Sequence, residues 1–253
     1  MSTVIDEVTR EPVEGRTASR TRDILKITDL HAFYGESHIL HGVNVNVKEG
    51  ELVTLLGRNG AGRSTTLKAI MNMVGRRTGS IVIGGQETLA MKPHHIPRLG
   101  VGYCPEERGI FASLDVHENL LLPPTVSSGG MSLDAIYAMF PNLFERRKSQ
   151  GTRLSGGEQQ MLAMARILRT GARILLLDEI TEGLAPVIVQ ALGEVLVKLK
   201  ASGMTIVLVE QNFRFAAPLA DRHFVMEHGE IIEEISAAEL SSKREHLNKL
   251  LGV

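Results

Sequence analysis

Three short, almost purely apolar runs constrain the fold of this chain more than any other feature of its sequence. They cover residues 52–56, 174–177 and 205–209. Strands with one solvent-exposed face alternate apolar and polar residues, whereas the strands of parallel sheets covered by helices are apolar almost throughout. The runs therefore predict an α/β core built on a parallel sheet.

The segments around these runs complete the predicted core. Pro186 begins a stretch with apolar residues at helical spacing, and Ser202 and Gly203 end it, so a β-α-β crossover joins the second and third runs. Alternating or β-branched segments predict a small antiparallel sheet at 24–30, 43–47 and 81–84. A hairpin at 224–226 and 231–235 precedes closing helical segments at 237–251, and residues 111–169 predict a helical insertion with helices near 132–140 and 158–168.

Composition excludes several classes of protein. Lys and Arg total 28 against 29 Asp and Glu, so no global basic field indicates nucleic acid binding. The single cysteine, Cys104, excludes an internal disulfide and favours a reducing compartment such as the cytoplasm. The apolar runs are far shorter than the roughly 20 residues of a membrane helix. The polar residues 1–22 lack the apolar region of a secretion signal and are predicted to be a disordered tail.

A glycine-rich segment between the run at 52–56 and a predicted helix matches a P-loop, the phosphate-binding loop of many nucleotide-binding proteins. Its glycines let backbone N–H groups turn inward around phosphate oxygens, the helix start adds a favourable dipole, and Ser64 can coordinate Mg²⁺. Arg63 stands where the pattern has lysine. Arginine keeps the charge, but its planar fork leaves the catalytic geometry open. The segment comprises Gly57, Arg58, Asn59, Gly60, Ala61, Gly62, Arg63, Ser64 and Thr65.

A second motif precedes the run at 174–177. Ser155 and Glu158 form an S-x-x-E capping box that begins a helix with an apolar face. Gly156 and Gly157 would then lie in the first helical turn, at a cost of up to about 1 kcal/mol each relative to alanine. Exposed backbone amides at a helix start can bind a phosphate, and this function would account for two glycines at positions where alanine is more stable. The motif comprises Leu154, Ser155, Gly156, Gly157, Glu158, Gln159 and Gln160.

Two acids follow the run at 174–177. Asp178 ends the predicted strand and Glu179 comes next. In this arrangement the first carboxylate can hold Mg²⁺ and the second can polarise an attacking water. Acids at strand ends are often only solvated loop residues, but the P-loop upstream favours the catalytic interpretation.

The P-loop, the 154–160 motif and the acid pair, in this order and spacing, resemble an ATP-binding cassette (ABC) ATPase over roughly residues 24–233. The resemblance implies a RecA-like P-loop NTPase core with an antiparallel β subdomain and an inserted helical subdomain. It also implies a head-to-tail dimer, in which the 154–158 signature of one subunit faces the γ-phosphate bound by the other. Tyr34 matches the adenine-stacking position and Glu106 the metal-contacting glutamine. Gln211 replaces the switch histidine, and Ile180 the proline after the acid pair.

Several departures from the general pattern are similar to the LivF-type ATPase subunits of branched-chain amino acid importers. They lie at 34–35, 104–111, 181–186 and 209–212. The resemblance implies ATP and Mg²⁺ as cofactors, a second ATPase subunit in a homo- or heterodimer, two membrane permease subunits and, indirectly, a periplasmic solute-binding protein. It places the chain on the inner face of the cell membrane. The permease is expected to dock near the 106–111 loop and the helical insertion.

Alternatives remain for the cargo and the role. Similar subunits serve importers of urea and short amides or of other amino acids, and Arg63 is compatible with an ATP-binding regulatory subunit whose hydrolysis is impaired. A cassette ATPase acting on DNA or ribosomes is disfavoured by the single motif set, the near-neutral charge and the absence of sustained heptads. The expected division is a core with its β subdomain at 23–105 and 170–235, a helical subdomain at 106–169 and a C-terminal helical segment at 236–253.

Overall fold

The structure is a computed structural model that describes residues 22–252. The predicted disordered tail covers residues 1–22, and of these 1–21 lie outside the described residues. Arg22 is bonded to the folded chain, because its guanidinium Nη2 donates to the carbonyl oxygen of Gly84 at 3.0 Å.

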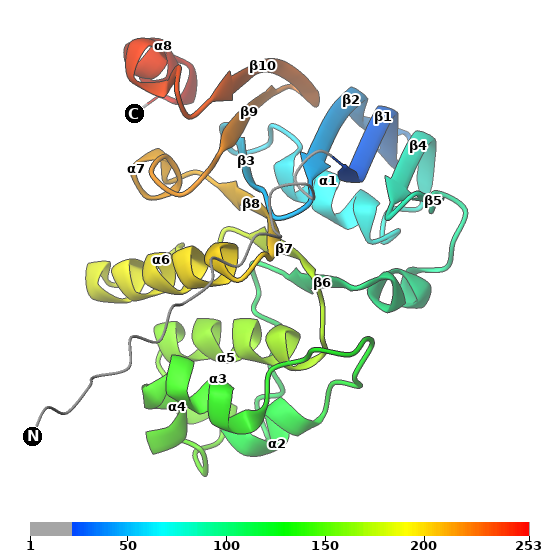
Figure 1. Cartoon of the computed structure of the whole chain (residues 1–253). Coiled ribbons are helices and arrows are strands. Elements are labelled where there is room, and N and C mark those ends of the chain that lie inside the picture. The colour runs from blue at the N-terminus through cyan, green and yellow to red at the C-terminus, as the bar shows by residue number, and fades with distance from the viewer. Residues whose placement is uncertain (1–21, 253) are drawn as a thin grey trace, which may run out of the picture.

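A six-stranded sheet forms the centre of the molecule (Figure 1). The three apolar runs are neighbouring strands in it: β3 (Leu52–Leu56), β8 (Thr205–Glu210) and β7 (Ile174–Asp178), all parallel. This confirms the predicted parallel sheet. β6 (Val101–Cys104) and β9 (Arg222–Glu227) extend it on the two sides, and β10 (Glu230–Ser236) pairs antiparallel with β9 as the predicted hairpin.

The central sheet is buried on both faces because different layers cover them. Leu175 and Leu177 of β7 belong to one apolar cluster with the helices α5 (Gly156–Arg169) and α6 (Pro186–Ala201). Ile174 and Leu176 alternate with them and belong to a second cluster with α1 (Arg63–Ile70) and the antiparallel sheet. Figure 1 places these two layers on opposite sides of β7 and β8. A strand with two apolar surroundings needs no polar face, which explains the continuous runs.

The antiparallel sheet has the order β2-β1-β4-β5. Its strands are β1 (Asp23–Tyr34), β2 (Ser37–Lys48), β4 (Arg76–Ile83) and β5 (Gln86–Glu87). The segments predicted for this sheet are confirmed, although β1, β2 and β4 are longer than predicted and Gly84 lies in the turn after β4. The prediction missed β6, which is only 4 residues long and contains Gly102. A side chain at Gly102 would collide with Ile167 of α5, so glycine lets this helix lie close to the sheet.

The predicted helical insertion contains four α-helices in addition to short turns. They are α2 (Val116–Leu121), α3 (Leu133–Met139), α4 (Pro141–Glu145) and α5. Within this segment the only strand-type pairing of described residues is an isolated bridge between Asp115 and Gln150. The remaining helical elements are η1 (Pro93–Leu99), η2 (Gly151–Arg153), α7 (Phe213–Ala216) and α8 (Leu240–Leu251). No helix between residues 22 and 252 is long and apolar enough to cross a membrane.

Candidate nucleotide site

The P-loop segment joins β3 to α1, as the sequence predicts. Gly60 and Gly62 have φ angles of 82° and 104°, in the left-handed region that favours glycine. A side chain at Gly57 would collide with the carbonyl oxygen of Met226 on the neighbouring strand. No side-chain cap satisfies the first amides of α1. The backbone N–H groups of this loop are therefore accessible at close range. A phosphate can accept hydrogen bonds from them.

Arg63 is buried at the start of α1 and contacts Glu179. Its Nη2 donates to Glu179 Oε1 at 2.7 Å and to Asn59 Oδ1 at 3.2 Å. The Arg63 side chain is only 3% exposed, and its Nη1 has no hydrogen-bond partner among the described residues. A buried guanidinium N–H without a partner is costly, and a phosphate oxygen would satisfy it. The structure thus brings the unusual arginine of the P-loop together with the predicted catalytic acid.

Ser64 and Asp178, two of the predicted metal ligands, also meet. Ser64 Oγ donates to Asp178 Oδ1 at 2.8 Å, and the hydroxyl of Tyr103 donates to Asp178 Oδ2 at 3.1 Å. Burial raises the pKa of Asp178, and the bonds from Ser64 and Tyr103 oppose this rise. One carboxylate and one hydroxyl beside a phosphate loop fit Mg²⁺, which keeps several waters and takes few protein ligands. No group of three or more His, Cys, Asp or Glu side chains suited to a metal occurs within residues 22–252.

Glu106, the third predicted metal ligand, is exposed on the loop after β6. Within the described residues no hydrogen bond joins it to Ser64 or Asp178. Its charge is nevertheless close enough to help raise the pKa of Glu179. The structure therefore places Glu106 near the acid pair without a hydrogen bond to the other two predicted oxygen ligands.

Glu179 lies directly after β7 with a φ angle of 46°, an uncommon conformation for a non-glycine residue. Burial raises the pKa of its carboxyl to about 7; Arg63 opposes this rise, and Glu182 and Glu106 add to it. A carboxyl with a pKa near the ambient pH is well suited to exchange a proton with water. Position and chemistry both favour a general base here.

Sequence reasoning missed Glu210 and Tyr103. Glu210 ends β8 and is buried, where its carboxylate accepts from Thr181 N at 3.1 Å and Thr181 Oγ1 at 3.0 Å. Burial raises its pKa to about 7. The next residue, Gln211, which replaces the switch histidine and is predicted to be catalytic together with Glu179, is exposed. The signal for Glu210 was its place at the carboxyl end of a buried strand beside the strand of Asp178, whereas nothing in the sequence paired Tyr103 with Asp178.

Tyr34 ends β1 and is 46% exposed. Its neighbour Phe33 stacks on His38 with ring centroids 4.2 Å apart, whereas Tyr34 makes no ring contact among the described residues. The Tyr34 side chain is thus partly exposed and has no aromatic partner in the described chain, as the predicted adenine contact requires.

The signature residues form their own local structure. Ser155 caps α5: its backbone N–H donates to Glu158 Oε2 at 2.7 Å, and Glu158 N–H donates to Ser155 Oγ at 3.3 Å. This confirms the predicted capping box. Leu154 is buried below it. No hydrogen bond or ion pair in the described part of the chain joins residues 154–158 to the P-loop, so the structure does not bring the two motifs together.

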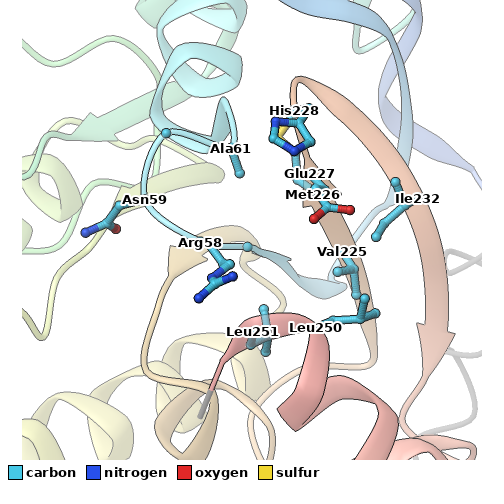
Figure 2. A pocket seen from close by; sticks show the side chains of 12 residues that line it. Arg58, Asn59, Ala61, Val225, Met226, Glu227, His228, Ile232, Leu250 and Leu251 are labelled. Atoms are coloured by element: carbon cyan, nitrogen blue, oxygen red, sulfur yellow. The ribbon is translucent and has the colours of Figure 1, made fainter.

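A pocket of about 290 Å³ adjoins the P-loop on the side of β9, β10 and α8 (Figure 2). P-loop residues 57–61 form one wall, and Figure 2 shows Arg58 extending toward Leu251 on the other. Arg63, Ser64, Asp178 and Glu179 do not line it. This pocket is therefore separate from the acid pair.

Comparisons with known proteins agree with this geometry. Residues 40–182 match the family model described as ABC transporter. The chain is 38% identical to the high-affinity branched-chain amino acid transport ATP-binding protein BraG of Pseudomonas aeruginosa, over 90% of this chain and 100% of that protein. It is 34% identical to the probable branched-chain amino acid transport ATP-binding protein LivF of Archaeoglobus fulgidus, over 91% of this chain and 99% of that protein.

A solved structure gives the same answer for the fold. A dimeric ATP-binding cassette in a post-hydrolysis state, bound to ADP and Pi, is similar with a TM-score of 0.74 and 26% identity, over 84% of this chain and 98% of that one. The matched residues 40–182 contain the P-loop, the signature and the acid pair. The chain therefore belongs to the ABC transporter family and is one of its ATP-binding, ATP-hydrolysing subunits.

Proposed function

We propose that this chain is the motor subunit of an importer for branched-chain amino acids. The observation that carries the proposal is its similarity, along almost the whole chain, to two proteins named for branched-chain amino acid transport. The P-loop, signature and acid pair identify an ATPase and do not themselves select a cargo. Importers of urea, short amides or other amino acids are the competing assignments.

The chain's own residues have separate tasks in this proposal. Backbone amides of residues 57–65 and the guanidinium of Arg63 hold the ATP phosphates, and Tyr34 stacks on adenine. Ser64 and Asp178 hold Mg²⁺, with Glu106 nearby; the ion neutralises phosphate charge when bound. Glu179 accepts a proton from the attacking water, for which its raised pKa is suited. Gln211 donates a hydrogen bond to the γ-phosphate.

The signature acts on a second subunit in this proposal. Leu154, Ser155, Gly156, Gly157 and Glu158 have no bond to this chain's P-loop, which supports their facing the nucleotide of a partner ATPase subunit. Two permease subunits and a periplasmic solute-binding protein complete the proposed assembly, with this chain on the cytoplasmic face of the membrane. The permease docks near the 106–111 loop and the inserted helices at 106–169.

The motor proposal is tested with Glu179→Gln in the intact importer reconstituted in vesicles. Hydrolysis is expected to fall by at least about 100-fold, since a general base contributes roughly 10²–10⁴ in rate. MgATP binding is expected to persist, because the P-loop is unchanged. Glu194→Gln, at an exposed position on α6, is the matched control and should retain most activity. Unchanged hydrolysis in the Glu179→Gln importer would refute the motor assignment.

The cargo is tested separately with the solute-binding protein that co-purifies with the intact importer. Calorimetry with leucine, isoleucine and valine is compared with urea and acetamide. Tight binding of the three amino acids supports the proposed cargo, whereas binding of urea or acetamide alone replaces it with the competing assignment.

One observation favours a second role, that of a regulatory subunit with slow hydrolysis. Arg63 neutralises Glu179 at 2.7 Å, and a base held in an ion pair is less available to water. If this pairing limits turnover, Arg63→Lys raises the hydrolysis rate many-fold while MgATP affinity changes little. An unchanged or lower rate in Arg63→Lys leaves the motor role as the only candidate.

A further inference from the structure

The loop after β6 makes a tight turn at Arg108. Arg108 has a φ angle of 65° and Gly109 one of 63°, and the Arg108 N–H donates to the carbonyl oxygen of Pro105 at 2.9 Å. The left-handed conformation is unfavourable for a residue with a long side chain. Such a conformation persists where surrounding contacts hold it. The contacts of the Arg108 side chain therefore matter for the shape of this loop.

These contacts lead to the signature. Arg108 Nη1 donates to Gln159 Oε1 at 2.9 Å. Gln159 Nε2 in turn donates to the carbonyl oxygens of Gly151 at 3.1 Å and Leu154 at 3.3 Å. Gln159 thus joins the loop to the turn that enters α5, immediately before the cap residue Ser155.

The Arg108 guanidinium also lies against the first turn of α5. Its nitrogens are 3.3 and 3.6 Å from the point where a side chain at Gly156 would begin. No carboxylate of residues 22–252 forms an ion pair with it, and its Nε is buried without a hydrogen-bond partner in that range. An ion pair therefore does not explain its orientation. The bond to Gln159 and the contact with Gly156 do.

Other contacts attach the same loop to the helical insertion. Arg166 of α5 donates to the carbonyl oxygen of Gly109 and lies over the ring of Phe111. Asn119 of α2 exchanges two hydrogen bonds, both 2.9 Å long, with the backbone of Phe111. At its other end the loop follows Tyr103, whose hydroxyl is bonded to Asp178. One short segment thus runs from the candidate metal ligand to the signature helix.

We propose that Arg108 is a positioning residue for the signature: it acts through Gln159 to hold residues 151–156 in the orientation in which they meet the partner's nucleotide. This inference rests on the proposed motor function, since it needs a partner nucleotide for the signature to meet.

The first test is hydrogen exchange of the full-length chain without nucleotide. Arg108→Gln is expected to speed the exchange of amides at 151–159 by about fivefold, as expected for the loss of one hydrogen bond to a charged group that is partly solvated. Arg146→Gln is the matched control, because Arg146 contacts Glu158 of the same helical turn at 3.4 Å but belongs to the end of α4. Equal exchange in both variants, or no change in Arg108→Gln, overturns the link to the signature.

The second test is steady-state hydrolysis by the intact importer. Arg108→Gln is expected to lower kcat about tenfold with KM for ATP within twofold of wild type, because the chain's own phosphate loop is untouched. Gln159→Ala should have a similar effect, and the double variant should be no worse than the poorer single variant if Arg108 acts through Gln159. Additive losses, or a changed KM with unchanged kcat, overturn the positioning role. A fully active Glu179→Gln importer would refute the motor function, while the exchange test would still decide whether Arg108 orders the signature.

Discussion

The P-loop half and the signature half of the site differ in how their polar groups are satisfied. Arg63, Ser64, Asp178 and Glu179 are bonded to one another across the ends of buried strands. The signature lies at a half-exposed helix end, where its own capping box, an ion pair between Glu158 and Arg146 and the link to Arg108 satisfy it. Before any ligand arrives, the first half is already cross-bonded, apart from Arg63 Nη1 and the uncapped amides of α1, whereas the signature makes its bonds at its own helix end. This contrast supports the proposal that the ligand of the signature belongs to another subunit.

Glycine is required for different physical reasons in the two halves. In the P-loop, Gly60 and Gly62 adopt φ angles that disfavour other residues. In the signature, Gly157 has ordinary helical backbone, but a side chain there would begin 2.7 Å from Cγ2 of Ile188 on α6. Close packing of α5 against α6 thus explains why residue 157 is glycine. The sequence analysis explained this glycine only by the approach of a phosphate. No neighbouring helix blocks a side chain at Gly156, so the approach of a phosphate remains the explanation for this glycine.

The largest effect is expected where the P-loop half is broken. Arg63→Ala removes the cation beside the phosphates and leaves the Glu179 carboxylate without its partner. An attraction of order 4 kcal/mol at contact distance corresponds to about 1,000-fold in affinity, and partial solvation reduces this to about 100-fold. Titration with MgATP in a calorimeter measures the loss. Arg63→Lys, which retains the charge, should recover affinity to within about tenfold, and an Arg63→Ala affinity within threefold of wild type would show that this arginine is not a phosphate ligand.

The sequence predicted the P-loop half better than the signature half, for a physical reason. Strands buried on both faces leave continuous apolar runs, so β3, β7 and β8 and the acid pair after β7 could be inferred locally. The partner of Arg63 and the Tyr103 contact depend on which strands become neighbours, and no local pattern encodes that. The capping box is local and was found, whereas the contact of Gly157 with Ile188 joins two helices and was not.

An intermediate effect is expected from filling the helix contact of the signature half. Gly157→Ala places a methyl group against Ile188; overpacking costs about 1–3 kcal/mol, and the gain in helix propensity returns up to about 1 kcal/mol. The free energy of unfolding should therefore fall by about 1–2 kcal/mol in urea titrations. Gly156→Ala is the matched control, since its nearest neighbour, Arg108 Nη2 at 3.3 Å, needs to move by only a few tenths of an ångström, and its free energy of unfolding should change little. Equal destabilisation by both changes would contradict the packing explanation.

The smallest effect is a pH dependence of opposite sign for two carboxyls: Glu210, whose pKa the charge of Glu179 in the P-loop half helps to raise, and Glu158 in the signature half. Burial raises the pKa of Glu210 from 4.5 to about 7, so the folded state binds more protons than the unfolded state between these values. Its contribution to stability is complete below pH 4.5 and is lost as the pH rises through 7. In the signature half, burial of Glu158 opposes ionisation, but bonds from Ser155 and the charge of Arg146 outweigh it and lower the pKa. Its contribution is present above pH 4.5 and is lost as the pH falls further.

Urea titrations of wild type, Glu210→Gln and Glu158→Gln at pH 4, 5 and 8 separate the two halves. Between pH 5 and 8, wild type should lose stability steadily relative to Glu210→Gln, because glutamine resembles the protonated acid and does not titrate. Relative to Glu158→Gln, wild type should keep a constant stability over that range and lose stability only toward pH 4. If both differences changed in the same direction, burial would dominate the pKa of Glu158 as it dominates that of Glu210. The contrast between a buried strand end and a capped helix end would then fail, because hydrogen bonds and the charge of Arg146 would not outweigh burial at Glu158.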